Sequence, residues 1–356
     1  MTETYPIIPF DALRLDGERI LLVGGAGFIG HHLALECRAK GAEVMVMDNL
    51  QVNNLVKIVS DVSLDETRRQ LYINFVLDRF RLMRDAGIEL ANVDARAMAD
   101  FAVLFNEFSP TKVVHLAAIS SAVDANKTPG LAYDLQITSL RNVLELCRLS
   151  DSKVDRVVFM SSSTVYGDFE GDSVDETVRP QPRGVYANGK YMGERMVREA
   201  WTLYELPYTI IRPSALYGIR CVSGRVSQKF VENALFGKPL LLEGGGGGRL
   251  DFTHIDDVVQ GIILGMALEG GRSRTFNITY GNARTIADLA AIIKEYIPNV
   301  ILEERPPATE KPKRGTLMVD RAKEYLGFQP KVALDEGYRE YVQWYIEQAD
   351  RVRTNA

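Results

Sequence analysis

Tyr186 and Lys190 are the residues whose types and spacing most directly suggest chemistry, because they lie four positions apart. In a helix these positions share one face, so the phenol and the ammonium would point into the same space. A free tyrosine has a pKa of about 10, and making it a base near neutral pH means a shift of roughly 3 units, or about 4 kcal/mol. One cation at about 4 Å, at an effective dielectric constant near 20, supplies an energy of that order. On its own, however, the same spacing is also common on surface helices.

A run of hydroxyl residues precedes this pair. The segment reads Ser161-Ser162-Ser163-Thr164-Val165-Tyr166-Gly167 and directly follows an apolar stretch. A serine hydroxyl beside Tyr186 could share the proton that the phenol transfers. The two segments together therefore predict a proton-transfer site.

A glycine-rich loop provides a second signal. Gly24-Gly25-Ala26-Gly27-Phe28-Ile29-Gly30 follows a predicted strand at 19–23 and precedes a helical run at 31–40. Glycines at 24, 27 and 30 let the backbone turn tightly and approach a pyrophosphate at the helix N-terminus. Asp48 ends the next predicted strand, 21 residues beyond Gly27. A carboxylate there accepts from the ribose 2′-hydroxyl of NAD and repels the 2′-phosphate of NADP, so the pattern predicts NAD.

Two further strand ends complete the expected cofactor site. Asp94 follows the third predicted strand and could hold an adenine amino group, although on its own a carboxylate at such a strand end is more often solvated. Leu116-Ala117-Ala118 ends the fourth strand with small residues, which would let a flat ring lie close. His31 and His32 are expected to be helix-start residues and not catalytic ones.

The composition excludes several classes of function. The chain has 356 residues, is 46% hydrophobic and 25% charged, and carries a net charge of -5, which is ordinary for a soluble enzyme and gives no reason to expect nucleic-acid or membrane binding. Its three cysteines are too few for a disulfide framework, which favours a reducing cytoplasm. Its four histidines lack metal-ligand spacing, so no catalytic metal is expected.

The pattern of elements predicts an α/β fold with a doubly wound parallel sheet and a smaller C-terminal α/β domain. Apolar runs alternate with helical segments up to about Tyr217, which is typical of strands covered on both faces. We expect strands at 19–23, 43–47, 88–93, 112–116, 154–160 and 208–211. The segment 53–86 is a long insertion that predicts an added helix, with capping of the cofactor or subunit contact as alternatives. The glycine run 244–248 predicts a flexible loop.

In this order the motifs resemble those of the extended short-chain dehydrogenase/reductase family, and most closely its NAD-dependent nucleotide-sugar epimerase/dehydratase branch. The matching residues are Gly24 to Gly30, Asp48-Asn49, Val93 to Arg96, His115 to Ala118, Ser161 to Gly167, Tyr186 to Lys190, Arg212-Pro213, Tyr217-Gly218, Asp251 to Val258, Arg314 to Leu317 and Leu326 to Pro330. The resemblance covers residues 19 to 345.

The resemblance implies a role for each matched position. Tyr186 would be the catalytic base and acid, and Lys190 would bind the nicotinamide ribose and lower the Tyr186 pKa. The catalytic hydroxyl would be Ser162, with Ser163 as the alternative. The implied NAD-binding residues are Gly24, Gly27, Phe28, Ile29, Gly30, Asp48, Asn49, Asp94, Ala95, Leu116, Ala117, Ala118, Tyr186, Lys190 and Pro213. The implied substrate residues are Ser162, Ser163, Tyr186, Arg249 and Arg314.

Two positions in the hydroxyl run narrow the reaction that the resemblance implies. The 4,6-dehydratases of the family carry an Asp-Glu pair where this chain has Ser163-Thr164, and the decarboxylating members usually keep a Glu at the position of Thr164. Without an extra acid or base, reversible oxidation at one carbon remains, which favours a 4-epimerase of a UDP-hexose or UDP-uronate. A 4-ketoreductase with net turnover of NAD(H) is the alternative, and a non-enzymatic NAD-binding protein is a remote one.

Some positions depart from the family pattern. Ala215 and Gln136 stand where an Asn is usual, and Leu250 separates Arg249 from the Asp-Phe pair that it normally precedes. Arg249 and Arg314 remain the candidates for binding the diphosphate, because arginine suits bidentate phosphate binding. Cys221 is expected to be a buried structural residue.

The expected domain organisation follows from the motifs. Residues 1–18 would form an N-terminal extension, and 19–215 the NAD-binding domain, to which 250–270 return. Residues 216–249 and 271–356 would form the substrate-binding domain. The resemblance further implies a homodimer through helices near 131–149 and 190–204.

Overall fold

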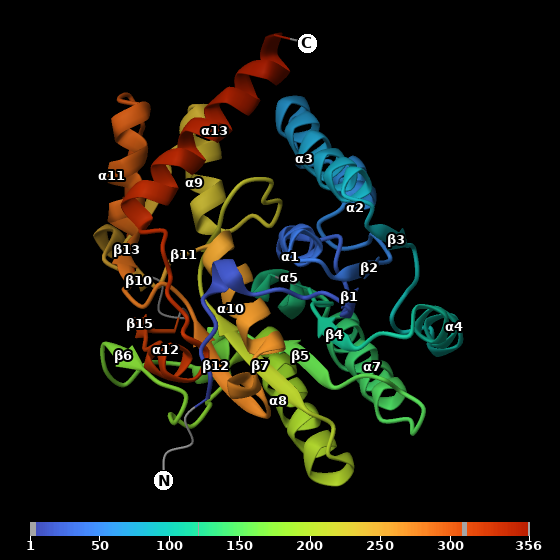
Figure 1. The fold of residues 1–356 in the computed structure, drawn as a ribbon. Coiled ribbons are helices and arrows are strands. Elements are labelled where there is room, and N and C mark those ends of the chain that lie inside the picture. The colour runs from blue at the N-terminus through green and yellow to red at the C-terminus, as the bar shows by residue number, and fades with distance from the viewer. Residues whose placement is uncertain (1–4, 120, 308–311, 355–356) are drawn as a thin grey trace.

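A seven-stranded parallel sheet lies at the centre of the protein in the structure, a computed structural model that describes residues 5–119, 121–307 and 312–354 (Figure 1). In spatial order the strands are β12 (Arg274–Ile278), β7 (Tyr208–Pro213), β5 (Arg156–Met160), β4 (Lys112–His115), β1 (Arg19–Val23), β2 (Glu43–Met47) and β3 (Glu89–Ala91). All six strand pairings are parallel. The expected α/β fold with a doubly wound sheet is therefore confirmed.

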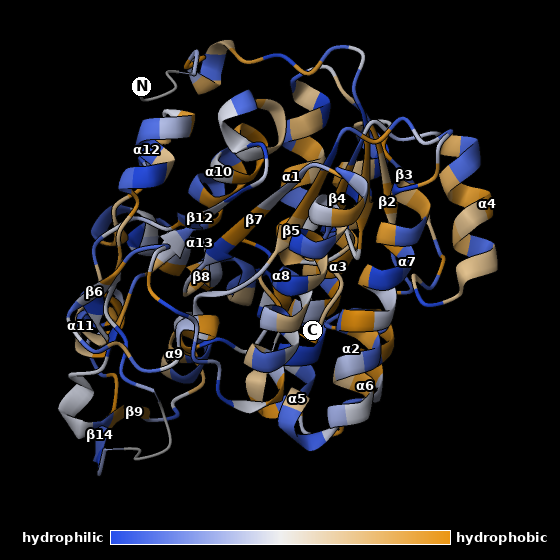
Figure 2. Ribbon diagram, turned by 90° about the horizontal axis from the view of Figure 1, so that it is seen from below, coloured by the Kyte–Doolittle hydropathy of each residue, from blue (hydrophilic) through white to orange (hydrophobic). Residues whose placement is uncertain are grey.

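Helices cover both faces of the sheet, which explains why its strands β1, β2, β4 and β5 are mostly apolar (Figure 2). On one face lie α1 (Phe28–Ala39), α10 (Ile255–Ala267) and α12 (Asp320–Leu326); on the other lie α4 (Met98–Phe108), α7 (Ser139–Cys147) and α8 (Gly184–Tyr204). Successive strand residues alternate between the two cores: Leu22 packs toward α1 and α10, whereas Leu21 packs toward α4 and α7. Burial on both sides requires a continuous apolar strand and not an alternating one.

The strand order reverses beside β1, which pairs with β2 on one side and β4 on the other. Connections from β1 and β4 therefore leave the sheet in opposite directions, and a crevice opens at the carboxyl ends of these strands. The glycine loop follows β1, and Leu116 to Ala118 follow β4. The topology thus brings together two of the segments that the sequence singled out.

A second core lies beside the sheet, at the top of Figure 1. It is formed by α9 (Val226–Leu235), α11 (Ile286–Tyr296) and α13 (Leu334–Thr354), together with the insertion helices α2 (Leu55–Ser60) and α3 (Glu66–Asp85). Paired short strands surround it: β8 (Leu216–Tyr217) with β11 (Thr253–His254), β9 (Leu240–Glu243) with β14 (Leu302–Arg305), and β10 (Arg249–Leu250) with β13 (Arg284–Thr285). A further pair is β6 (Ser173–Val174) with β15 (Thr316–Leu317), and short helices α5 (Ala122–Lys127) and α6 (Pro129–Tyr133) lead into α7.

One expectation differs from the structure. The second segment of the predicted substrate-binding part began at residue 271, but β12 is an edge strand of the central sheet and pairs with β7. Its polar residues Thr275 and Asn277 weaken the strand signal that marks its neighbours. The glycine run begins with a short 3-10 turn, in which Gly244 to Gly246 all have positive φ and Gly246 is buried beside Ala287. Residues 1–4 of the predicted N-terminal extension lie outside the described residues, as do residues 308–311.

Within the described ranges, no helix combines the length and the apolar character that crossing a membrane requires. Among the same residues, no group of three or more His, Cys, Asp or Glu side chains is arranged to hold a metal ion. All three cysteines are buried and free of disulfides, as expected for Cys221.

Candidate active site

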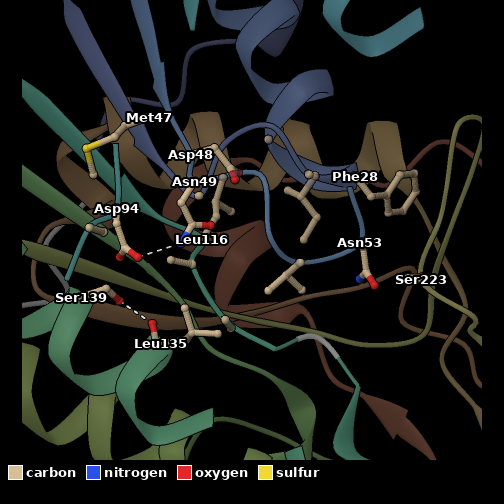
Figure 3. A pocket seen from close by; sticks show the side chains of 18 of the residues that line it. Phe28, Met47, Asp48, Asn49, Asn53, Asp94, Leu116, Leu135, Ser139 and Ser223 are labelled. Carbon is tan, nitrogen blue, oxygen red and sulfur yellow. Dashed lines mark hydrogen bonds between the residues drawn. The ribbon is translucent and has the colours of Figure 1, made fainter. Parts of the chain in front are cut away.

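Two adjoining cavities occupy the crevice at the carboxyl ends of the strands. The first, which we call the glycine-loop cavity, encloses about 920 Å³ including its open side (Figure 3). Twelve predicted cofactor residues line it: Gly24, Gly27, Phe28, Ile29, Gly30, Asp48, Asn49, Asp94, Ala95, Leu116, Ala117 and Ala118. The second, the serine cavity, encloses about 1180 Å³ including its open side. It is lined by the predicted residues Ser162, Ser163, Tyr186, Lys190, Pro213 and Arg314.

The glycine loop leaves no room for side chains where it turns. A Cβ on Gly24, which has a φ of +77°, would lie 2.6 Å from the Ala117 nitrogen. A Cβ on Gly30 would lie 2.2 Å from the Gly25 oxygen. The bare backbone leaves the N-terminus of α1 facing the cavity, where its dipole favours a bound phosphate. This geometry fits the pyrophosphate of a dinucleotide.

Asp48 is tied to this loop. Its carboxylate accepts from the backbone nitrogens of Ala26 at 3.0 Å and Leu50 at 2.8 Å. Burial raises the pKa of Asp48, while these two N–H groups favour its charged form. A carboxylate held at this place fits a ribose 2′-hydroxyl and would repel a 2′-phosphate, so the site suits NAD.

Asp94 has partners that the sequence did not suggest. Its carboxylate accepts from Arg96 at 2.6 Å and from Asn49 at 3.0 Å, and Figure 3 shows the latter contact inside the cavity. The Arg96 guanidinium lowers the pKa of Asp94 to about 2. Asp94 therefore lies in the cavity as a charged carboxylate that already accepts hydrogen bonds from Arg96 and Asn49.

Tyr186 and Lys190 lie on the first turns of α8 and both face the serine cavity. Lys190 donates to the Met160 carbonyl at 2.7 Å, its ammonium lies 5.9 Å from the centroid of the Tyr186 ring, and burial lowers its pKa to about 7. Burial raises the pKa of Tyr186, whereas the charge of Arg225 and a hydrogen bond with Ser162 favour the phenolate. The prediction that Lys190 lowers the Tyr186 pKa therefore stays a prediction, and Arg225, which the sequence did not indicate, is a second cation whose charge favours the phenolate.

The three serines separate into three environments. Ser161 donates to Glu194 at 2.6 Å and belongs to the core, whereas Ser162 lies near enough to Tyr186 for its hydroxyl to favour the phenolate. Ser163 lines the serine cavity, and its carbonyl accepts from Arg314 at 2.9 Å. Ser162 is therefore the hydroxyl that the structure brings to the phenol, because the chain passes here from β5 into a short 3-10 helix at Ser163–Tyr166.

The two predicted diphosphate arginines are placed differently. Arg314 lines the serine cavity, and burial lowers its pKa to about 10. Arg249 is exposed, donates to the Ala283 carbonyl at 3.0 Å and does not line either cavity. Successive residues of a strand face opposite sides, so on β10 Leu250 faces the serine cavity and Arg249 faces away.

Sequence reasoning missed the loop 218–225, which closes both cavities. Val222 and Ser223 line the glycine-loop cavity, and Arg225 lines both. Within the described parts of the chain, no side chain forms a hydrogen bond or ion pair with the Arg225 guanidinium. The loop carries no motif, because its place beside the glycine loop arises only when the second core packs against the sheet.

Known proteins resemble this chain over most of its length. Residues 20–279 match the NAD-dependent epimerase/dehydratase family. UDP-glucuronate 4-epimerase 1 of Arabidopsis thaliana is 28% identical over 94% of this chain and 78% of its own length. UDP-glucuronic acid decarboxylase 2 of the same plant is 28% identical over 91% of this chain and 67% of its own length.

A solved structure has the same fold. It is the UDP-glucose 4-epimerase of Thermotoga maritima, which is 27% identical, superimposes with a TM-score of 0.77 and covers 92% of this chain and 98% of that one. The family match spans the glycine loop, Asp48 and the Tyr186-Lys190 pair, which the fold brings to one crevice. The chain belongs to the NAD-dependent epimerase/dehydratase family, and its cofactor is NAD.

Proposed function

We propose that the protein is a nucleotide-sugar 4-epimerase, and that a UDP-uronate is preferred over a UDP-hexose. The observation that carries this proposal is the lining of the serine cavity. It holds both Ser162 and Tyr186, but none of its described lining residues is Asp, Glu or His. Eliminating water from a sugar needs an additional acid or base, whereas reversible oxidation at one carbon needs only the phenol and the cofactor.

The residues of the serine cavity would divide the proton transfer among them. Bound NAD supplies reversible hydride transfer, and the glycine loop with Asp48 would hold it. Tyr186 would take the proton of the sugar 4-hydroxyl when C4 is oxidised, and it would return that proton when the 4-keto sugar has turned over in the site and is reduced on its opposite face. Ser162 holds the phenol by its hydrogen bond, while Arg225 favours the phenolate. NAD is unchanged after each cycle.

Arg225 supports the uronate as the substrate class. Its guanidinium stands at the junction of the two cavities and has no anionic partner among the described residues. A carboxylate at C6 of the sugar would accept two parallel hydrogen bonds from such a group. A hexose offers only a hydroxyl there, and Arg314, at the other side of Ser163, remains for the diphosphate.

The reaction can be tested with UDP-glucuronate, UDP-glucose and UDP-N-acetylglucosamine, with products identified by NMR. We expect the 4-epimer of at least one substrate, UDP-glucuronate first, without net formation of NADH. A UDP-pentose would show a decarboxylase, a 4-keto-6-deoxy sugar a dehydratase, and stoichiometric NADH consumption with a keto sugar a ketoreductase. Failure on a broad panel of nucleotide sugars would refute the proposal.

The preference can be tested separately with Arg225→Leu and Arg225→Lys. A hydrogen bond to a charged group contributes about 1.5–3 kcal/mol, so the ratio of kcat/KM for uronate over hexose should fall roughly tenfold to a hundredfold in Arg225→Leu. Arg225→Lys should recover part of this ratio. Because Arg225 also acts on Tyr186, kcat can fall for both substrates, and an unchanged ratio would count against carboxylate recognition.

We also propose a homodimer that works in the cytoplasm. The helices that the family resemblance indicated carry exposed apolar side chains, which a dimer interface would bury. They are Leu131 on α6 and Met192 and Leu203 on α8, which are 44%, 46% and 60% exposed. The buried free cysteines suit a reducing compartment. Light scattering after size exclusion should give twice the chain mass, and Leu203→Glu should shift it toward the monomer; a monomeric parent protein would refute the dimer.

A further inference from the structure

Helix α3, in the insertion that the family motifs do not explain, holds the loop 218–225 at two points. This loop presents Val222, Ser223 and Arg225 to the glycine-loop cavity. Figure 1 shows α3 beside α1 and running toward α13, so it stands between the cofactor-binding sheet and the second core. Two separate groups of hydrogen bonds connect it to the loop.

The first attachment is Arg79, whose side chain is fully buried. Its Nε donates to the Arg220 carbonyl at 3.1 Å, and its Nη2 donates to the same oxygen. Arg220 has a φ of +60°, a conformation that costs energy for a residue with a side chain. The Arg220 guanidinium in turn donates to His31 at 3.2 Å, and His31 lies on the first turn of α1, directly behind the glycine loop. Arg79 thus holds the backbone of Arg220 in its unfavourable conformation, next to the cofactor site.

The second attachment begins at Tyr72, a buried residue of α3. Its hydroxyl donates to Glu232 on α9 at 2.7 Å, and Gln228 donates to the same carboxylate oxygen at 2.7 Å. The Gln228 side-chain oxygen accepts from the backbone nitrogens of Ser223 at 2.9 Å and Gly224 at 3.0 Å. A continuous, buried chain of hydrogen bonds therefore runs from α3 to the loop.

These attachments, together with the hydrogen bond that the Ile219 carbonyl accepts from His32 at 3.2 Å, position a loop that lacks regular structure of its own. None of residues 218–225 lies in a helix or strand, so no regular backbone hydrogen bonds position the loop. Gly218, Arg220 and Gly224 also have positive φ. Hydrogen bonds to buried charged groups, such as those of Arg79 and Glu232, are among the stronger ones in proteins. Loss of either attachment would therefore allow the loop to move away from the cavity.

We propose that α3 is a clamp that keeps the loop 218–225 closed over bound NAD, so that the cofactor stays on the protein between turnovers. Arg79 and Tyr72 are its positioning residues, and neither lines a cavity. A 4-epimerase needs such retention because the same cofactor molecule must return the hydride that it received. The clamp acts on the NAD site alone, and its effect does not depend on which sugar is the substrate.

The test measures NAD release from the purified holoprotein in the absence of sugar. Arg79→Met and Tyr72→Phe are the clamp variants, with Arg79→Lys as the conservative one. Phe75→Leu is the matched control, because Phe75 lies on the same helix and is 1% exposed. Its ring centroid lies 4.7 Å from that of Trp344, and its side chain forms no hydrogen bond with the loop. Bound NAD after timed dialysis is quantified by mass spectrometry, and the melting temperature is recorded for each variant.

We expect NAD release to be at least about tenfold faster in Arg79→Met, severalfold faster in Tyr72→Phe and near the parent rate in Arg79→Lys. Phe75→Leu should lower the melting temperature yet keep the parent release rate. If Arg79→Met does not fold, Tyr72→Phe decides the question. Equal release from Phe75→Leu and the clamp variants, or parent rates in both clamp variants, would overturn the proposal, and neither result depends on the sugar reaction.

Discussion

Replacing Glu194 by Gln should cost the protein a large part of its stability. Glu194 lies on α8 one turn after Lys190 and is fully buried. Its carboxylate accepts from Arg212 at 2.6 and 2.8 Å and from Ser161 at 2.6 Å. The amide has nearly the same shape as the carboxylate but lacks its charge, so the substitution removes the anion without creating a cavity.

The magnitude follows from the burial of the partner. The Arg212 side chain is only 2% exposed, and although burial lowers its pKa, Glu194 more than offsets this and holds the pKa above its ordinary value. Leaving a buried guanidinium without its anion costs about 3–5 kcal/mol. Because domains of this kind are stable by roughly 5–15 kcal/mol, the variant should unfold at a markedly lower urea concentration.

Urea unfolding followed by circular dichroism measures this effect. The double variant Glu194→Leu with Arg212→Met serves as the control, because replacing both partners by apolar groups is often neutral. It should be more stable than Glu194→Gln, although Ser161 loses its acceptor. A loss below about 1 kcal/mol in Glu194→Gln, or a double variant less stable than the single one, would refute the assignment of a tightly coupled ion pair.

Three further predictions concern the site. Lys190 has a pKa of about 7 when folded and about 10.4 when unfolded, so above pH 7 the unfolded chain binds the proton that the folded protein lacks. Stability of the cofactor-free protein should therefore rise between pH 7 and about 10, by at most roughly 1.4 kcal/mol per unit, and melting curves of Lys190→Met should not show this rise. Gly30→Ala should lower both stability and NAD content, because its Cβ would meet the Gly25 oxygen at 2.2 Å; parent NAD content would contradict the close approach. Tyr186→Phe should abolish turnover of nucleotide sugars while NAD remains bound, and full activity would remove Tyr186 from its role.

Much of the cofactor site could be predicted because it is local in sequence. The turn at Gly24 to Gly30 depends on residues that are adjacent in the chain, and Asp48 meets the loop because β1 and β2 pair in parallel. Repeated apolar runs were sufficient to predict the sheet, since a strand buried on both faces must be apolar throughout. The pair on α8 was predictable for the same reason, because four residues are one turn of a helix.

The rest depended on contacts between segments that are distant in sequence. Which of three adjacent serines meets Tyr186 depends on how β5 ends, and which of Arg249 and Leu250 faces the cavity depends on the pairing of β10 with β13. A shift of one residue reverses the face of a side chain, and no periodicity in the sequence sets that register.

By itself, the sequence determined the family, the cofactor and the residues that can transfer a proton, because these depend on residue type and on spacing within single elements. Only the tertiary structure decided that the charge of Arg225 also favours the Tyr186 phenolate, and that α3 reaches the loop 218–225. The physical reason is the same in both cases. Electrostatic and hydrogen-bonding effects depend on distance in space, and the chain brings Arg79 to Arg220, and Arg225 to the cavity that Tyr186 lines, only when the sheet and the second core pack together.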